Sequence, residues 1–440
     1  MPIDAHVHFF TRALMSESGG RLLALLRAAA AAEHLIRRHQ PYGSLDTGTL
    51  VELLESGFPE NSTDALKDMD AAYGPNWSYV PLMLDLEYTF TDSSALEESS
   101  EHDEGRQDPD GGRLRRMRHS LWDRVEEAWE LAAGGNLEHG AARLLAPDSF
   151  RIQRRDLTAL KADIPDRIFP FLGLDPRRQH DEGVNLTELA GDYVGPGCPF
   201  CGIKLYTATG FSPTDPALFN PGGLYEHCVR NRIPITVHFA LGGFATPLSS
   251  VWIRGDIYNP DYGEAVPAGD RGEGRLNFAT KMTGGTIPAA VHERQVFLNH
   301  PRLWDKVLRR WPGLIINFAH AGGSEETAGY LNGEAGWMWW LFHRAMKYRG
   351  VYADFSAHPG DDGLLEPLGK VLKKHSLLRR KLLFGSDYFL SALSERDPAV
   401  YLGRHREAFG FAWKAISERN AARFLSGGGF PKQGIFRTLM

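Results

Sequence analysis

The 440-residue chain has few cysteines and no long apolar run. Three cysteines cannot form a disulfide framework, so a reducing compartment is expected. No apolar stretch approaches the roughly 20 residues that a membrane-spanning helix needs. The first residues also lack the cationic and apolar regions of a signal peptide. We therefore expect a cytoplasmic protein that has no membrane partner.

An excess of positive charge is missing as well. Lys and Arg number 49 against 55 Asp and Glu, which gives a formal net charge of −6. No basic arm appears, nor a basic stripe interleaved with aromatic residues, and this argues against nucleic acid as a partner. The expected partner is a small-molecule substrate, and the sequence is compatible with a homo-oligomer.

Eight short apolar runs recur along the chain, with helical patterns between them. They cover residues 2–6, 78–84, 168–174, 202–206, 234–238, 314–319, 351–355 and 381–386. Most are continuously apolar rather than alternating, as is typical of parallel strands buried on both faces. This predicts an α/β protein with a (β/α)8 TIM barrel. A doubly wound sheet is the alternative, but it would bring fewer strand ends to one point.

The remaining length falls in the connections between these runs. We expect a single barrel domain over 1–440, with large insertions at about 11–77, 85–167 and 239–299, after strands 1, 2 and 5. The last insertion is rich in Gly, Pro, Tyr and Asn and follows the carboxyl end of a strand. At that position it would form a lid or wall over a site in the barrel mouth.

Metal-capable side chains stand at the carboxyl ends of these runs. They are His6, His8, Lys204, His238, His320 and Asp387. His6 and His8 are two residues apart on an extended segment, so they point to the same face and could hold one ion. A metal-bound water ionises near neutral pH and becomes a nucleophile. Asp387 could both touch the metal and accept the proton of that water.

The order of these residues resembles the amidohydrolase superfamily: His-x-His on strand 1, Lys on strand 4, His on strands 5 and 6, and Asp on strand 8. The phrases at 317–323, 351–356, 383–388 and 420–425 resemble the subgroup called amidohydrolase 2, which includes aminocarboxymuconate semialdehyde decarboxylase. The resemblance covers the tip of strand 1 and most of the chain from about 168 to 426. It implies a metal enzyme on a TIM barrel, but one barrel hosts many reactions.

The resemblance implies two metal arrangements. In decarboxylase-like members, one ion is held by the equivalents of the two N-terminal histidines, His238 and Asp387, and the equivalent of His320 is an acid or base. Lys204 with its next two residues instead resembles dihydroorotase, where the matching lysine is carboxylated and bridges two metals, and His320 would bind the second. We expect one or two divalent ions, zinc first, with iron and manganese as alternatives. An uncarboxylated Lys204 would anchor a substrate carboxylate or pair with Asp387.

The expected activity is metal-dependent hydrolysis of a small organic amide, lactam, ester or lactone. Asp387 would be the general base, and His320 or a second metal would stabilise the developing oxyanion. One alternative is a non-oxidative decarboxylase at a mononuclear metal site. Another is a non-heme diiron oxygenase on the same barrel, because His and carboxylate ligands also suit iron. A catalytically silent barrel that binds a metal or ligand is the alternative outside enzymes.

Further residues beside the strand ends are candidates for substrate contacts. They are Asp85, Glu87, Tyr206, His358 and Tyr388. The two acidic residues follow strand 2, where they would orient a ligand histidine or contact the substrate. The two tyrosines adjoin candidate ligands and would line the pocket unless strand alternation turns them outward.

Overall fold

The computed structural model describes residues 1–9, 11, 59–89, 148–246, 248–280, 287–358, 363–388 and 397–427. The expected insertions at 11–77 and 85–167 fall largely outside these described residues. All eight apolar runs lie within them, so the expected strands can be compared one by one.

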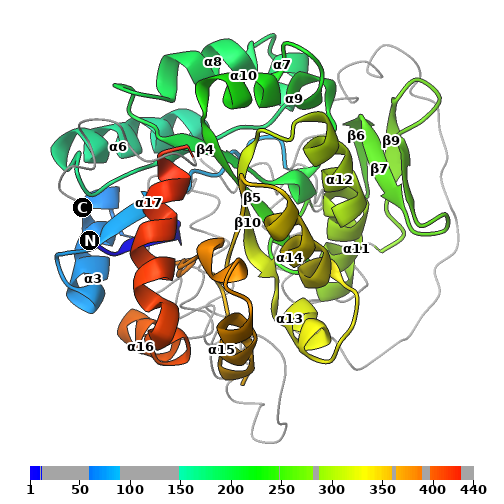
Figure 1. The fold of residues 1–440 in the computed structure, drawn as a ribbon. Helices are drawn as coiled ribbons and strands as arrows, with labels where there is room; N and C mark the ends of the chain where they lie inside the picture. Colours follow the sequence, from blue (N-terminus) through cyan, green and yellow to red (C-terminus); the bar gives the residue numbers. More distant parts are fainter. Residues whose placement is uncertain are drawn as a thin grey trace, which may run out of the picture.

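Eight parallel strands form the centre of the molecule (Figure 1). They are β1 (Ile3–Val7), β2 (Ser78–Pro81), β3 (Phe171–Gly173), β4 (Gly202–Leu205), β5 (Pro234–Ala240), β10 (Ile315–Gly322), β11 (Val351–Asp354) and β12 (Leu382–Leu383). Six pair in the order β12-β11-β10-β5-β4-β3, and β1 pairs with β2. Parallel bridges from Leu82 to Phe171 and from Val7 to Tyr388 join these two sheets at both edges. The ring is therefore closed, as in a TIM barrel, and the expected α/β fold with parallel strands is confirmed.

The helices lie outside this ring and cover it (Figure 1). They are α3 (Ser62–Tyr73), α6 (Ser149–Asp163), α7 (Arg177–Asp181), α8 (Leu186–Tyr193), α9 (Pro216–Phe219), α10 (Leu224–Asn231), α11 (Ile287–Asn299), α12 (Pro301–Arg310), α13 (Ser324–Leu331), α14 (Trp337–Lys347), α15 (Leu365–Lys374), α16 (Pro398–Phe409) and α17 (Asn420–Leu425). In α12 a proline occupies the first turn, where the absent N–H would have no partner anyway. Its buried residues Leu303, Trp304, Val307 and Leu308 form one apolar face against the barrel.

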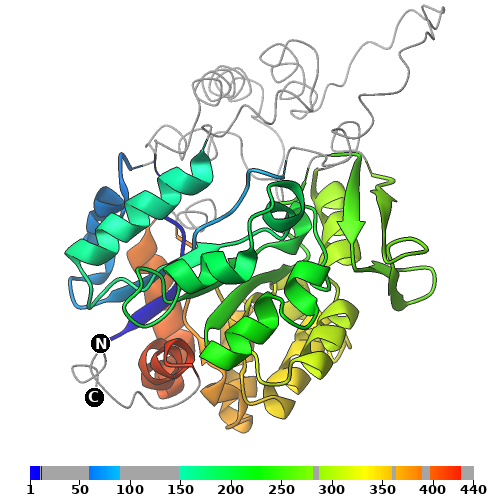
Figure 2. The same cartoon turned by 90° about the horizontal axis from the view of Figure 1, so that it is seen from above.

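Two antiparallel strand pairs lie between β5 and α11. They are β6 (Ser250–Arg254) with β9 (Glu273–Asn277), and β7 (Asp256–Asn259) with β8 (Glu264–Pro267). Figures 1 and 2 both show them at one side, outside the ring. A small apolar cluster that includes Val251, Ile253 and Phe278 holds this part together. The chain then returns through α11, which reaches the barrel beside β5.

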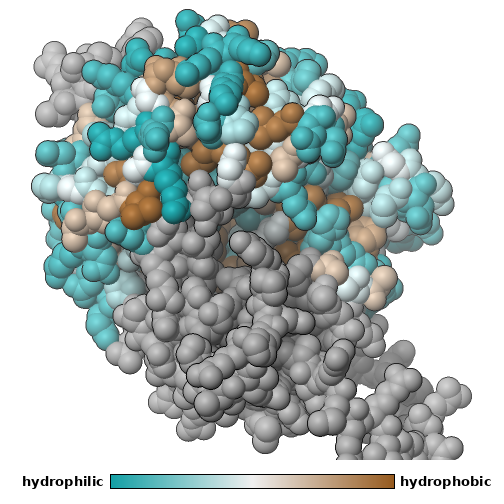
Figure 3. All heavy atoms as spheres, turned by 90° about the horizontal axis from the view of Figure 1, so that it is seen from below, coloured by the Kyte–Doolittle hydropathy of each residue, from teal (hydrophilic) through white to brown (hydrophobic). Residues whose placement is uncertain are grey.

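The surface of the described part is mixed. Figure 3 shows hydrophilic and hydrophobic residues interspersed over the described portion of one face. Among the helices of the described ranges, none has a run that is long and apolar enough to cross a bilayer.

Candidate metal centre

Three site atoms meet where β1 and the end of β12 lie side by side. The Nε2 atoms of His6 and His8 are 3.2 Å apart. Asp387 places its Oδ1 atom 3.2 Å from His6 Nε2 and 3.4 Å from His8 Nε2. All three residues are buried. A triangle of this size is what three ligand atoms make around one ion at about 2.0–2.2 Å from each.

Hydrogen bonds on the far side of each ring turn both Nε2 atoms toward that common point. His8 Nδ1 donates to the Leu82 carbonyl at 2.8 Å, and His6 Nδ1 lies 3.2 Å from Asp354 Oδ2. Both rings therefore carry a hydrogen on Nδ1, and their Nε2 atoms face each other and a carboxylate oxygen. Within the described residues, Asp387 Oδ1 accepts no hydrogen bond. Lone pairs at this distance repel unless a cation lies between them, so these residues fit a divalent ion.

The backbone at the strand ends is shaped to make this approach. At Gly385 a Cβ atom would lie 2.7 Å from the Cβ of His6, so a larger residue would push β12 away from β1. Asp387 has φ 59° and His320 has φ 65°, both in the left-handed region. That conformation costs roughly 1–2 kcal/mol for a residue with a Cβ. The Asp387 amide donates to the His6 carbonyl at 2.8 Å, which helps to hold the turn in place.

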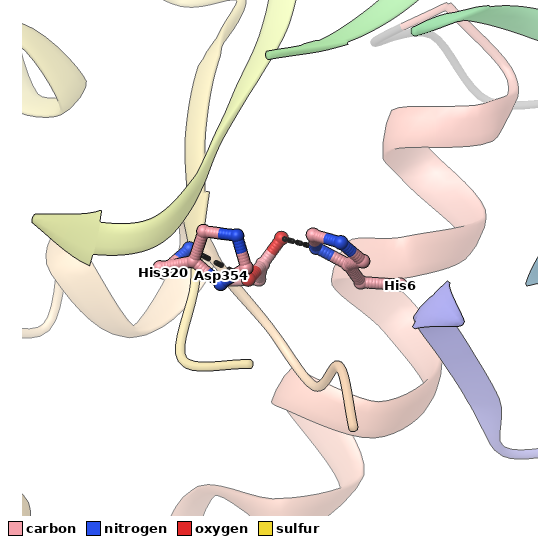
Figure 4. A group of neighbouring side chains, drawn as sticks. All are labelled: His6, His320 and Asp354. Carbon is pink, nitrogen blue, oxygen red and sulfur yellow. Dashed lines mark hydrogen bonds and ion pairs between the residues drawn. The ribbon is translucent and has the colours of Figure 1, made fainter. Parts of the chain in front are cut away.

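A second group of metal-capable atoms comprises His6, His320 and Asp354 (Figure 4). Asp354 Oδ1 accepts from the amides of His320 and Ser356, both at 3.0 Å, and from the Ser356 hydroxyl. Its Oδ2 accepts from Asn317 Nδ2 at 2.6 Å and from His6 Nδ1. Burial raises the pKa of Asp354, but His6 and these hydrogen bonds outweigh it and lower the pKa overall. A carboxylate has about four lone-pair sites, so this one is fully used in positioning its neighbours.

His320 lies beside both His6 and His238. Its ring centroid is 4.9 Å from that of His6 and 4.8 Å from that of His238. Burial lowers the pKa of His320 to about 4, so the ring is neutral near pH 7. It is thus suited either to ligate a metal or to accept a proton.

His238 lies beside His320, but its Nε2 atom faces the loop after β5. His238 Nε2 lies 2.9 Å from the carbonyl oxygen of Gly242, and the ring stacks on Tyr206 with centroids 4.1 Å apart. Tyr206 in turn accepts a hydrogen bond from the Phe244 amide at 2.5 Å. In the described residues, His238 belongs to neither group of metal-capable atoms. Its role as a fourth ligand stays a prediction.

Lys204 points into the barrel from β4 and is only 2% exposed. No carboxylate of the described residues lies within ion-pair distance of its Nζ, which is 5.8 Å from the centroid of the Tyr206 ring. Burial lowers the pKa of Lys204 to about 8, although Asp387 and Asp354 act in the opposite direction. Near neutral pH Lys204 therefore carries its charge in a buried position.

The remaining candidates make contacts of their own, and their roles toward a substrate stay predictions. Arg178 donates to Asp85 at 2.6 and 2.8 Å and to Glu87 at 2.7 Å, so both acids serve an ion-pair network with α7. His358 is buried, with Nε2 at 3.0 Å from Thr327 Oγ1. The Tyr388 carbonyl accepts the His8 amide, which places this tyrosine in the closing seam of the barrel.

Sequence reasoning missed Asp354 and Ser356. They sit at the end of the seventh strand, in the phrase Ala353-Asp354-Phe355-Ser356, which contributed only to the resemblance. A carboxylate at a strand end was the available signal, and the same rule that selected Asp387 would have selected Asp354.

The family model described as amidohydrolase matches residues 3–427. A search of curated proteins found no match. Similar solved structures include an uncharacterized TIM-barrel protein from Bordetella bronchiseptica (13% identity, covering 97% of this chain and 99% of that one, TM-score 0.44). Another is 5-carboxyvanillate decarboxylase from Novosphingobium aromaticivorans with bound manganese (11% identity, 97% of each chain, TM-score 0.46). A third is 2,6-dihydroxybenzoate decarboxylase from Rhizobium (13% identity, 97% and 99%, TM-score 0.45).

These names describe those proteins, and the assignment of this chain rests on the family model. That model spans almost the whole length of the chain, from the strand that carries His6 and His8 to the last helix of the described residues. The chain belongs to the amidohydrolase family, in the subgroup called amidohydrolase 2.

Proposed function

We propose that this chain is a metal-dependent, non-oxidative decarboxylase that acts on a small conjugated carboxylic acid. The observation that carries the proposal is Lys204, a buried ammonium without a carboxylate partner among the described residues, in the same barrel mouth as the ligand atoms of His6, His8 and Asp387. A desolvated charge of this kind strongly favours an anion brought to it, because little water is present to screen the pair. A neutral amide or lactone would leave it uncompensated.

The hydrogen bonds that Asp354 accepts support one metal ion at this site in preference to two. Its lone pairs are occupied by hydrogen bonds, so the group around His320 has no spare carboxylate oxygen for a second ion. A second ion would require a carboxylated Lys204, and that anionic group could no longer hold an acid. Zinc, manganese and iron all accept the remaining His and Asp ligands.

The chemistry follows from the positions of these groups. The ion held by His6, His8 and Asp387 would supply a positive charge for a substrate oxygen. Lys204 holds the substrate carboxylate. The bond between this carboxylate and the rest of the substrate breaks, and the electron pair stays on the substrate carbon that had carried the carboxylate. His320, within the same pocket, carries the proton that this carbon then receives. The balanced reaction is R–COO⁻ plus H⁺ giving R–H and CO2.

The electron pair that stays on the substrate when CO2 leaves restricts the class of substrate. An isolated carbanion is too unstable to form, so the pair must be delocalised into the substrate itself. Aromatic acids that carry an oxygen substituent, and unsaturated acids conjugated to a carbonyl, both provide such a sink together with an oxygen for the ion.

The test is a substrate panel run in D2O with protein loaded with manganese or zinc. The panel contains conjugated carboxylic acids, and amides, lactams, esters and lactones of similar size. We expect CO2 release from one group of acids, and a product with one deuterium on the carbon that had carried the carboxylate. Hydrolysis of a neutral ester, lactone or amide without CO2 release would overturn the proposal in favour of the hydrolase. Consumption of dioxygen by iron-loaded protein would favour the oxygenase.

A further inference from the structure

The hydroxyl of Ser356 is the meeting point of the two histidines that face each other across the site. Its Oγ atom lies 3.0 Å from His6 Nδ1 and 2.9 Å from His320 Nδ1, and it also contacts Asp354 Oδ1. Ser356 is wholly buried, so its hydroxyl has no contact with bulk water. One hydroxyl therefore connects a ligand of the metal triangle with the proposed proton carrier.

The hydrogen atoms in this cluster can be assigned by counting. A hydroxyl has one hydrogen to donate and two lone pairs. Asp354 also accepts two backbone amides and the Asn317 side-chain amide, so it acts as an ionised acceptor. The Ser356 hydrogen goes to Asp354, and the two lone pairs of Oγ remain for hydrogens that the rings supply.

Independent acceptors on each ring agree with this count. His6 Nδ1 also faces Asp354 Oδ2 at 3.2 Å, and His320 Nδ1 also faces the Ser356 carbonyl at 3.2 Å. Neither of these oxygens has a hydrogen to give, so each Nδ1 must donate. Both rings then hold a hydrogen on Nδ1, which leaves Nε2 as the position for a metal or for a second proton.

We propose that Ser356 is a positioning residue that locks His320 in the Nδ1–H tautomer and couples its orientation to that of His6. His320 then begins each turnover as a proton acceptor at Nε2. It must take a proton from the substrate or from solvent before it can give one to carbon. This last consequence rests on the proposed function, whereas the tautomer assignment does not.

The two histidines differ in how much they depend on the serine. Without the hydroxyl, His6 Nδ1 keeps its ionised partner Asp354. His320 Nδ1 keeps only the Ser356 carbonyl, which it shares with His358 Nδ1 at 3.2 Å. Loss of the hydroxyl should therefore release the tautomer of His320 and spare that of His6.

The experiment is 15N NMR of the histidine side chains in the full chain, with and without added zinc. Signals are assigned by their disappearance in His6→Gln and His320→Gln. In wild type we expect both rings as single Nδ1–H tautomers. In Ser356→Ala we expect a mixture of tautomers for His320 and no change for His6. A wild-type His320 with its hydrogen on Nε2, or an unchanged His320 in Ser356→Ala, would overturn the proposal.

Ser417→Ala is the matched control. Ser417 is equally buried, and among the described residues its hydroxyl bonds only the Trp413 carbonyl at 2.9 Å, four residues earlier in the chain. Ser417→Ala removes the same atom and should leave both histidine tautomers unchanged.

Once a substrate is known, Ser356→Ala should lower kcat by about 10-fold or more, with KM nearly unchanged. A loss of this size is usual when the residue that hydrogen-bonds to a metal ligand is removed. Because the NMR readout needs no substrate, its outcome is independent of whether decarboxylation is the reaction.

Discussion

At the residue scale, the site is defined by how three side chains share one small volume. His6, His8 and Asp387 place acceptor atoms within 3.4 Å of one another, and hydrogen bonds behind the rings prevent either histidine from turning away. Such an arrangement is stable only around a cation. The effect of each substitution therefore depends on whether the residue mainly supplies metal affinity or electric charge.

Asp387→Asn is expected to abolish turnover while most of the metal remains bound. The two histidines supply most of the affinity, whereas the negative charge of Asp387 is lost in the amide. Metal analysis after gel filtration and turnover of the same sample check this prediction. Asp387→Ala is the comparison, because it removes the ligand atom as well and should lower metal content. Full turnover in metal-loaded Asp387→Asn would exclude a catalytic role for this carboxylate.

Lys204 should impose a pH limit on substrate binding. Its pKa is lowered by burial to about 8, so the ammonium is present below that pH and is lost as the pH rises through it. The KM for an anionic substrate should therefore rise above pH 8, and Lys204→Met should raise KM at pH 7 and remove this pH dependence. The control is Lys381→Met. Burial also lowers the pKa of Lys381 to about 8, but its amine donates to the Tyr348 carbonyl, away from the site. An identical KM profile in wild type and Lys204→Met would exclude the anion-binding role.

At the scale of elements, α11 and the loop after β5 act together on His238. Gln295 donates to the Gly242 carbonyl at 3.1 Å, and Asn299 donates to the His238 carbonyl at 2.9 Å. Gly242 is also the partner of His238 Nε2. The orientation of His238 is thus set by a helix about 60 residues further along the chain.

Gly243→Ala should disturb this loop specifically. Gly243 has φ 101°, and a Cβ there would lie 2.6 Å from His238 Cε1 and 2.7 Å from the Tyr206 hydroxyl. We expect a fall in kcat/KM on the order of tenfold or more, because small displacements of site groups cost this much. Gly263→Ala is a matched control, with φ 66° and no atom within 4 Å of its Cβ position. If both substitutions lower kcat/KM equally, backbone strain alone explains the loss and the contact with His238 does not.

At the scale of the whole molecule, the proposed metal ligands span the seam that closes the barrel. His6 and His8 come from β1, and Asp387 follows β12, the strand on the other side of that seam. An ion bound to all three ties together strands that are distant in sequence. It binds the folded barrel and not the unfolded chain.

Removal of the metal should therefore lower the melting temperature. A ligand at 100 times its Kd stabilises the folded state by about 2.7 kcal/mol. Calorimetry of metal-loaded and chelator-treated protein measures this difference. His8→Ala should show little further change on chelation, since a ligand from β1 is already missing. If chelation leaves the melting temperature of wild type unchanged, the triangle does not hold an ion across the seam.

The sequence by itself determined the barrel strands and the set of candidate ligands. Continuous apolar runs are typical of strands buried on both faces, and side chains at the carboxyl ends of barrel strands must gather at one mouth. The spacing of His6 and His8 is enough to place both on one face of β1, because side chains alternate along a strand. Those inferences need only local pattern and the geometry of a closed parallel ring.

Only the tertiary structure decided what each side chain does there. Arg178 pairs with Asp85 across 93 positions, and Ser356 reaches His6 across 350. The turning of His238 toward Gly242 depends on α11, and the saturation of Asp354 depends on donors from three strands. Hydrogen bonds between residues so distant in sequence produce no periodic pattern in the sequence. They form only once the ring has closed, when the packing brings buried polar atoms together and each of them needs a partner.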